Sequence, residues 1–148
     1  MKFRKWNLDN DYKYLTKWWE QHEFGKVPKE CLPPDGIIIE VNNVPVCAGG
    51  LYLGVGTKFG FMEWLIVDKK LGVKTAHKAL NLCIENILKI ARENKVRLVY
   101  TVTSEKSLQK RYVKYHGMEV AEKSATTFMK DLTGEKYNDL EWITDEQD

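Results

Sequence analysis

One stretch constrains the fold of this chain more than any other, because it joins a buried-strand pattern to a long helical pattern. Residues 61–67 read FMEWLIV and are apolar except at Glu63. Such a run is typical of a strand buried on both faces. From Ala76 to Ala91 the apolar residues recur every three or four positions, which predicts an amphipathic helix with Thr75 as its N-cap. The stretch therefore predicts a strand, a short loop and a helix.

The loop between this strand and this helix is basic, with Lys69, Lys70 and Lys74. Free amides at a helix N-terminus beside positive charge favour phosphate binding. The same residues also suit an ordinary connection with a solvated lysine face, because most such connections bind nothing. Both interpretations stay open at this point.

Length, charge and cysteine content limit the classes of protein to which the chain can belong. With 148 residues, 43% of them hydrophobic and 30% charged, it fits one globular domain. The net charge of +2 divides unevenly, which predicts a basic domain over residues 1–132 and an acidic tail over 133–148. Three widely spaced cysteines predict neither a disulfide framework nor a zinc site, and they favour a reducing cytoplasm. No run has the length or composition of a membrane span or a signal peptide.

Periodicity and turn residues predict the remaining elements. We expect a strand over 2–6, a helix over 9–22 capped by Asn7 or Asp9, and a proline-rich loop over 23–35 that covers a site opening. Strands over 36–41 and 45–53, with a bulge at Gly49-Gly50, lead into the strand described above. After the long helix we expect a buried strand over 96–102, a helix over 105–115 capped by Ser104, and an antiparallel pair over 118–121 and 126–132. The first helix carries an aromatic stripe that suits either core packing or a substrate groove, formed by Tyr12, Leu15, Trp18 and Trp19.

The fold class that follows is α/β (α+β), with helices on both faces of a mixed, mostly antiparallel sheet. A strand, a helix and a second strand of these lengths form a crossover, so the strands over 61–67 and 96–102 should run parallel. Over residues 1–132 this order resembles the GNAT (Gcn5-related N-acetyltransferase) family, and in particular small bacteriophage-encoded members. The residues that carry the resemblance are the strand end Leu65-Ile66-Val67, the helix start Ala79-Leu80 and the helix end Gly117-Met118. The family's loop arginine is replaced by Gly72, and its two loop glycines by Thr75 and His77.

The resemblance implies acetyl-CoA as co-substrate. In the family two parallel strands splay apart, and main-chain groups of the first strand pair with the pantetheine arm. This implies main-chain contacts from Leu65, Ile66 and Val67. The loop and the helix start would hold the pyrophosphate through Lys69, Lys70, Gly72, Lys74, Thr75, Ala76 and His77. Ser104 and Ser107 occupy the region in which the family has polar residues near the pantetheine.

The candidate catalytic residues are Glu63, Tyr112 and Tyr115. Glu63 interrupts an apolar strand at a position that matches a frequent GNAT base, and burial would raise its pKa toward neutrality. Strand alternation places Phe61, Glu63 and Leu65 on one face and Met62, Trp64 and Ile66 on the other. A glutamate paired with lysine or arginine at a sheet end is the alternative. The family's acid tyrosine falls at Val113, and its neighbours Tyr112 and Tyr115 are either substitutes for it or core aromatics.

The function expected from the resemblance is acyl-CoA-dependent N-acyltransfer, with acetyl passing to an amine of a small molecule, a protein or a modified nucleobase. One alternative is a catalytically silent member that binds or inhibits a partner. Another is a phage nucleic-acid-modifying relative whose basic body approaches phosphate, although Lys110, Arg111 and Lys114 are too few to decide this and no arginine-rich stripe is present. We expect no membrane association, and a homodimer is possible.

Overall fold

A computed structural model of the protein describes residues 1–134. Most of the predicted acidic tail, from residue 135 on, lies outside the described residues. The elements, in chain order, are β1 (Lys2–Lys5), α1 (Leu8–Gln21), the 3₁₀ turn η1 (Lys29–Cys31), β2 (Asp35–Val41), β3 (Val44–Leu53), β4 (Phe59–Val67), α2 (Val73–Glu93), β5 (Leu98–Tyr100) and α3 (Lys106–His116).

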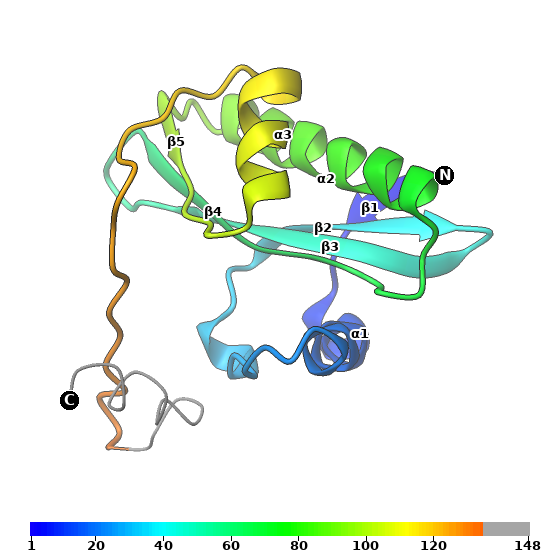
Figure 1. Ribbon diagram of the computed structural model, residues 1–148. Helices are drawn as coiled ribbons and strands as arrows, with labels where there is room; N and C mark the ends of the chain where they lie inside the picture. Colours follow the sequence, from blue (N-terminus) through cyan, green and yellow to red (C-terminus); the bar gives the residue numbers. More distant parts are fainter. Residues whose placement is uncertain (135–148) are drawn as a thin grey trace.

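The strands form one five-stranded sheet in the order β1-β2-β3-β4-β5. All neighbours are antiparallel except β4 and β5, which run parallel. Figure 1 shows α1 on one face of the sheet and α2 with α3 on the other. The predicted fold class, the meander and the parallel pair are therefore confirmed.

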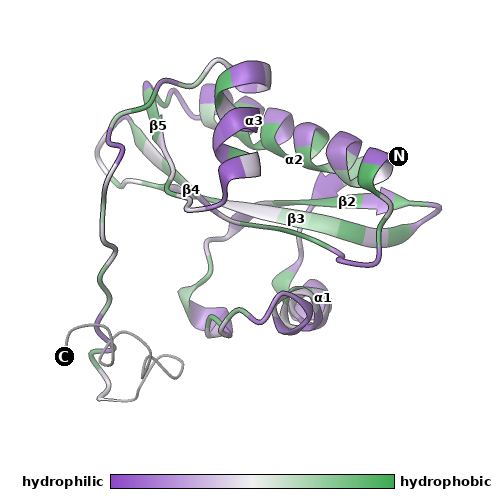
Figure 2. Ribbon diagram, in the orientation of Figure 1, coloured by the Kyte–Doolittle hydropathy of each residue, from purple (hydrophilic) through white to green (hydrophobic). Residues whose placement is uncertain are grey.

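Each face of the sheet has its own hydrophobic core. Under α2, the helix face formed by Cys83, Ile84 and Ile87 packs on the inner residues of β2, β3 and β4. Under α1, Leu15, Trp18 and Trp19 pack on the opposite face, which confirms the core interpretation of the aromatic stripe. Figure 2 shows hydrophobic residues along β2 and β3.

Two glycines allow an indole to lie flat against the sheet on the α1 side. A Cβ at Gly36 would lie 2.0 Å from the Trp6 ring, and one at Gly50 would lie 2.6 Å from it. The predicted bulge is also present, because the β3–β4 register shifts between Ala48 and Gly50. Side chains larger than hydrogen at these positions would force Trp6 out of the core.

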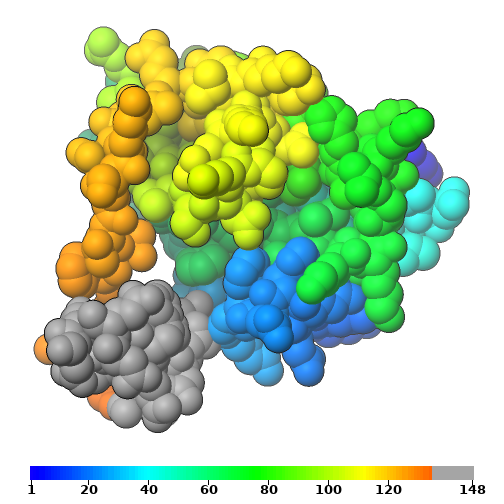
Figure 3. All heavy atoms as spheres, viewed as in Figure 1, coloured from blue at the N-terminus to red at the C-terminus, as the bar shows by residue number. Residues whose placement is uncertain are grey.

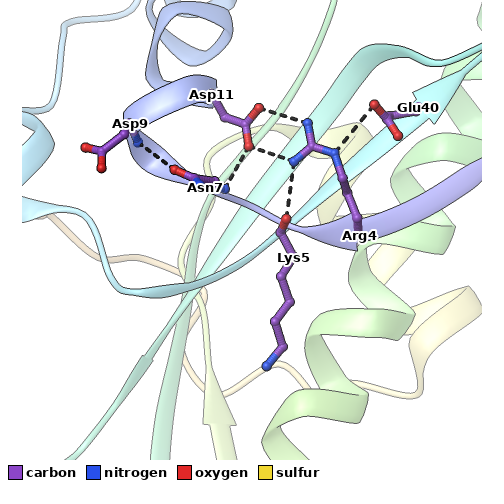
Figure 4. Close-up of polar contacts among 6 residues, drawn as sticks. All are labelled: Arg4, Lys5, Asn7, Asp9, Asp11 and Glu40. Carbon is purple, nitrogen blue, oxygen red and sulfur yellow. Dashed lines mark hydrogen bonds and ion pairs between the residues drawn. The ribbon is translucent and has the colours of Figure 1, made fainter.

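A partly buried ion pair joins β1 to the start of α1 (Figure 4). Arg4 donates two hydrogen bonds to Asp11, of 2.8 and 2.9 Å, and a longer ion pair of 3.5 Å joins it to Glu40. Burial acts to raise the pKa of Asp11, but hydrogen bonds from Arg4 and from the Asn7 N–H hold it below its usual value. Asn7, and not Asp9, is the N-cap, since its side chain accepts from the Asp9 N–H.

Both predicted N-caps of the later helices are wrong. Helix α2 begins at Val73 with Gly72 as its N-cap, so Thr75 lies inside the first turn. Val73 is 87% exposed, so this first turn adds nothing to the apolar pattern from which the helix start was predicted. Helix α3 is capped by Glu105 and not by Ser104, and it ends, as predicted, at Gly117 in the left-handed conformation with φ of 64°.

The predictions after α2 need two further corrections. Strand β5 has three residues in place of the expected 96–102, and it is not buried: Leu98 is 65% exposed. The expected antiparallel pair over 118–121 and 126–132 does not form, and these residues are irregular. The short β5 accounts for the missing pair, because a three-residue strand offers too short an edge for further strands.

Among residues 1–134, no helix combines the length and the apolar character that crossing a membrane requires.

Candidate functional site

The two parallel strands, β4 and β5, separate partway along β4, and we call this point the fork. Pairing between β4 and β5 runs from Phe59 opposite Leu98 to Phe61 opposite Tyr100 and then stops. Strand β4 continues to Val67, whereas the chain after Tyr100 leaves toward α3. Figure 3 shows a recessed surface between α3 and α1, in the region to which the fork opens. The edge of β4 beyond Phe61 is therefore free to pair with something other than β5.

The main-chain N–H and C=O groups of Ile66 face a different edge of β4 from those of its two neighbours. The Asp68 N–H donates to Val46 O at 2.8 Å, so Asp68 faces β3. Because successive residues of a strand direct their main-chain groups to opposite edges, Ile66 also faces β3, while Leu65 and Val67 face the open edge. One of these groups is occupied, since His22 Nε2 lies 2.8 Å from Val67 O.

A bulge at the fork overturns the predicted alternation of faces. Trp64 has φ of 65°, a left-handed conformation, and Gly50 pairs with Glu63 while Ala48 pairs with Ile66. As a result Met62 and Leu65 both belong to the cluster under α2, whereas Trp64 and Ile66 belong to the cluster on the α1 side. Left-handed backbone at a non-glycine residue is costly and is found mainly where function or packing over-determines it.

Glu63 lies at the branch point, two residues after Phe61, the last residue of β4 that pairs with β5. Burial raises its pKa to about 7, and the Trp64 N–H, which donates to Oε1 at 3.2 Å, lowers it only in part. No lysine or arginine forms an ion pair with Glu63 anywhere in residues 1–134, so the structure disagrees with the alternative of a paired glutamate. A carboxyl group with a pKa near 7 can accept a proton at physiological pH.

Tyr112 and Tyr115 have different environments although both lie on α3. Tyr112 is buried in the cluster under α2, and its pKa is raised to about 12 by burial, while a hydrogen bond with the Thr101 side chain lowers it. The charge of Glu63 also acts to raise the pKa of Tyr112. Tyr115 is exposed and packs edge-on against His77. Val113, at the family's tyrosine position, faces solvent with 51% exposure.

The N-terminus of α2 presents unpaired amides beside the basic loop. The first main-chain bond of the helix is donated by Ala76 N to Gly72 O, so the N–H groups of residues 72–75 have no partner in the described part of the chain. The loop amides before them are occupied, because Lys69 N donates to Gln21 Oε1 and Lys70 N to Asp68 Oδ1. The Lys69, Lys70 and Lys74 side chains lie on the surface around these amides.

His77 joins α2 to α3. Arg111 Nη1 donates to His77 Nδ1 at 3.0 Å and to Asn81 Oδ1 at 3.0 Å, and His116 Nε2 contacts the same oxygen at 3.0 Å. The structure therefore gives His77 a packing role at the interface of the two helices. Ser104 and Ser107 are both exposed at the start of α3.

The loop over residues 22–34 is fastened to the body by aromatic side chains. Tyr12 donates to Val27 O at 2.5 Å, Tyr52 to Cys31 O at 2.6 Å and Trp6 to Pro33 O at 3.2 Å. The sequence predicts that this loop covers a site opening, but it does not predict which residues hold the loop in place. Sequence reasoning missed Tyr52, Thr101 and His22 altogether, because each belongs to the site through a contact far along the chain.

Comparison with known proteins gives a consistent picture of the fold. No family model and no curated protein matches the sequence. A probable acetyltransferase matches with a TM-score of 0.68 and 13% identity over 88% of this chain and 99% of its own. A Mycobacterium tuberculosis protein solved in complex with CoA matches with a TM-score of 0.65 and 17% identity over 85% and 76% of the two chains. Glucosamine-6-phosphate N-acetyltransferase from Arabidopsis thaliana matches with a TM-score of 0.62 and 14% identity over 87% and 98%.

The chain has the GNAT fold. These identities are too low to carry an activity or a substrate across, so they establish architecture alone. Within the GNAT fold, the fork between β4 and β5 places Glu63 beside the part of β4 that β5 leaves unpaired.

Proposed function

We propose that this protein is an acyl-CoA-dependent N-acyltransferase that passes acetyl to an amine. The observation that carries the proposal is the fork: β4 runs on to Val67 after its pairing with β5 has stopped at Phe61. A half-buried carboxyl group with a pKa of about 7 lies at its branch point.

The residues present fit a CoA thioester despite the altered loop. Leu65 and the Val67 N–H would pair with the amide groups of the pantetheine arm, as an added strand would. The four unpaired amides of residues 72–75 and the lysines beside them would hold the pyrophosphate in place of the missing arginine. Lysines act here as point charges, without the fork geometry of a guanidinium group. Acetyl-CoA, when bound, supplies the activated acyl group.

Each side chain of the proposed site has one task. Glu63 takes the proton that the attacking amine loses, directly or through a water molecule. Tyr112, protonated at neutral pH because its pKa is about 12, returns a proton to the sulfur that leaves. Tyr115 is exposed and turned toward His77, so we assign the acid role to Tyr112 alone.

Thermal denaturation with CoA and with acetyl-CoA tests the proposal. A ligand at 100 times its dissociation constant stabilises a protein by about 2.7 kcal/mol, which is a readily measured shift in melting temperature. We expect both compounds to give such a shift. No shift with either would favour the catalytically silent alternative.

The structure weakens the alternative of a nucleic-acid-modifying enzyme, because one of the basic residues of α3 is turned toward α2. Of the three basic residues of α3 named for this alternative, Arg111 is turned inward to His77 and Asn81, which leaves Lys110 and Lys114 on the surface. Two lysines are a small electrostatic footprint for a nucleic-acid surface.

A further inference from the structure

Four aromatic side chains form a row across β3, β4 and β5 next to Glu63, and we call them the aromatic platform: Tyr52, Phe59, Phe61 and Tyr100. Tyr52 lies opposite Phe61 in one strand pair, and Phe61 lies opposite Tyr100 in the next. The ring centroids of these two pairs are 6.2 and 6.0 Å apart, and those of Phe59 and Tyr100 are 6.2 Å apart. Opposed residues project from the same face, so the row is continuous.

The aromatic platform lies on the same face of the sheet as α1, over a part of that face that α1 does not cover. The alternate residues Leu51, Met62 and Val99 pack in the cluster under α2, so the platform projects to the other side of the sheet. The core beneath α1 extends along β4 only as far as Trp64 and Ile66. Phe59 and Tyr100 are each 41% exposed. An exposed group of large apolar side chains marks an interaction site more often than a random surface does.

Two hydrogen bonds hold one end of the platform in place before anything binds. The Tyr52 hydroxyl donates to Cys31 O at 2.6 Å and accepts from Trp64 Nε1 at 2.8 Å, which fixes the ring at the inner end of the row. A surface held in this way loses little conformational freedom when a ligand packs on it.

Glu63 connects the platform to the proposed chemistry. It lies two residues after Phe61 and before the bulge, so the two side chains start on the same face. Its charge contributes to the raised pKa of Tyr52 on that face and of Tyr112 on the other. Because Phe61 and Glu63 are alternate residues of one strand, we take the carboxyl group to be close enough to accept a proton from an amine that packs on the platform.

We propose that the aromatic platform binds the acceptor, and that the acceptor is a small amine carried by a flat aromatic group. This inference rests on the proposed acyltransferase function. In the three contacting ring pairs of the platform the ring planes differ by 25 to 36°, so a flat group that packs on one ring meets the next ring at a shallow angle. A cage for an alkylammonium ion would need ring faces turned toward a common centre.

A matched pair of amines tests the inference. We would use 2-phenylethylamine and 2-cyclohexylethylamine, which carry the same amine and differ in whether the ring is flat, and follow thiol release from acetyl-CoA. We expect kcat/KM to be about tenfold higher for the phenyl compound. In Tyr100→Ala this preference should fall through a higher KM for 2-phenylethylamine, while the KM for acetyl-CoA stays unchanged.

Phe3→Ala is the control variant, because Phe3 is also half exposed but lies on β1, at the opposite edge of the sheet. It should leave both rates unchanged. Three outcomes would overturn the platform if CoA still shifts the melting temperature. They are equal rates for the two amines, no transfer to either amine, and equal activity of Tyr100→Ala and Phe3→Ala. If the preference for the phenyl compound increases in Phe128→Ala, the platform binds the chain's own C-terminal segment and not the acceptor. That result would also overturn the inference. Absence of the CoA shift itself would remove the proposed function together with this inference.

Discussion

Glu63 is the residue on which the proposed chemistry depends most. Its pKa of about 7 comes from burial at a position where none of the described residues supplies a cation. A salt-bridged glutamate would stay ionised over the whole physiological range and would be a weak base. The missing partner is therefore what makes this carboxyl group suited to proton transfer.

The pH dependence of catalysis follows from this value. Glu63 must be ionised to take a proton, so kcat/KM should rise with pH and level off above about 7. Glu63→Gln should lower kcat by about 10²-fold or more and abolish the rise of kcat/KM with pH. Steady-state rates of the two proteins between pH 5 and 9 provide the measurement. A wild-type profile that is flat across neutrality would contradict the assignment.

The same burial predicts an effect on folding stability. Because the folded state binds the Glu63 proton more tightly than the unfolded state, the protein loses stability as pH rises from about 4.5, the unfolded pKa, through about 7. Glu63→Gln should remove this loss and be more stable than wild type at pH 8, by roughly 2 kcal/mol once solvent screening at this half-buried position is allowed for. Urea unfolding at pH 5 and pH 8 checks the sign, and a variant less stable than wild type at pH 8 would show that the carboxylate is satisfied.

The two tyrosines of α3 offer a matched pair. Tyr112→Phe should reduce kcat by about 10²-fold with little change in KM for acetyl-CoA, because the proton donor is lost but the ring still fills the core. Tyr115→Phe should behave as wild type, since its hydroxyl group is exposed. Rates measured with a good and a poor leaving thiol separate the two roles. Equal effects of both substitutions would count against Tyr112 as the acid.

At the scale of elements, the start of α2 allows one amide to be removed without breaking the helix. Val73 is the first helical residue, a position that tolerates proline, and Gly72 has the extended backbone, with φ of −62° and ψ of 151°, that proline requires before it. Val73→Pro should weaken CoA binding several-fold, whereas Val73→Ala should not. Calorimetric titration of both variants decides this, with circular dichroism as the control for the helix. Identical affinities would mean that the Val73 amide does not contact the ligand.

How far the elements could be predicted depended on whether their residues pack. The strands and helices with continuous cores, such as α1 and β3, had clear periods and were placed to within a residue or two. The first turn of α2 packs on nothing, so no periodic signal marked Val73 as its start. Strand β5 was overestimated because an apolar run does not show where a strand turns away from its neighbour.

The candidate site was predictable in part for a similar reason. A lone acid in an apolar strand is visible in sequence, and so Glu63 could be singled out. The bulge at Trp64 was not visible, since its left-handed backbone occurs at a residue with no preference for it. Contacts such as those of Thr101 with Tyr112, or Tyr52 with Trp64, join distant segments and leave no local pattern.

At the scale of the molecule, the sheet separates two sides that meet only at the fork. One side carries Tyr112, α3 and the free amides of α2, and the other carries the aromatic platform. In the proposed reaction the thioester enters from the first side and the amine from the second. Glu63 lies at the fork, and its charge acts to raise the pKa of a tyrosine on each side.

Amide hydrogen exchange at the open edge of β4 tests most directly whether the fork receives the thioester arm. Exchange rates of Leu65, Ile66 and Val67 would be followed by NMR with and without CoA. We predict that the Leu65 and Val67 amides, which face the open edge, gain protection when CoA binds, while Ile66, already directed to β3, changes little. Unchanged exchange at Leu65 and Val67 in the presence of saturating CoA would contradict binding of the arm in the fork.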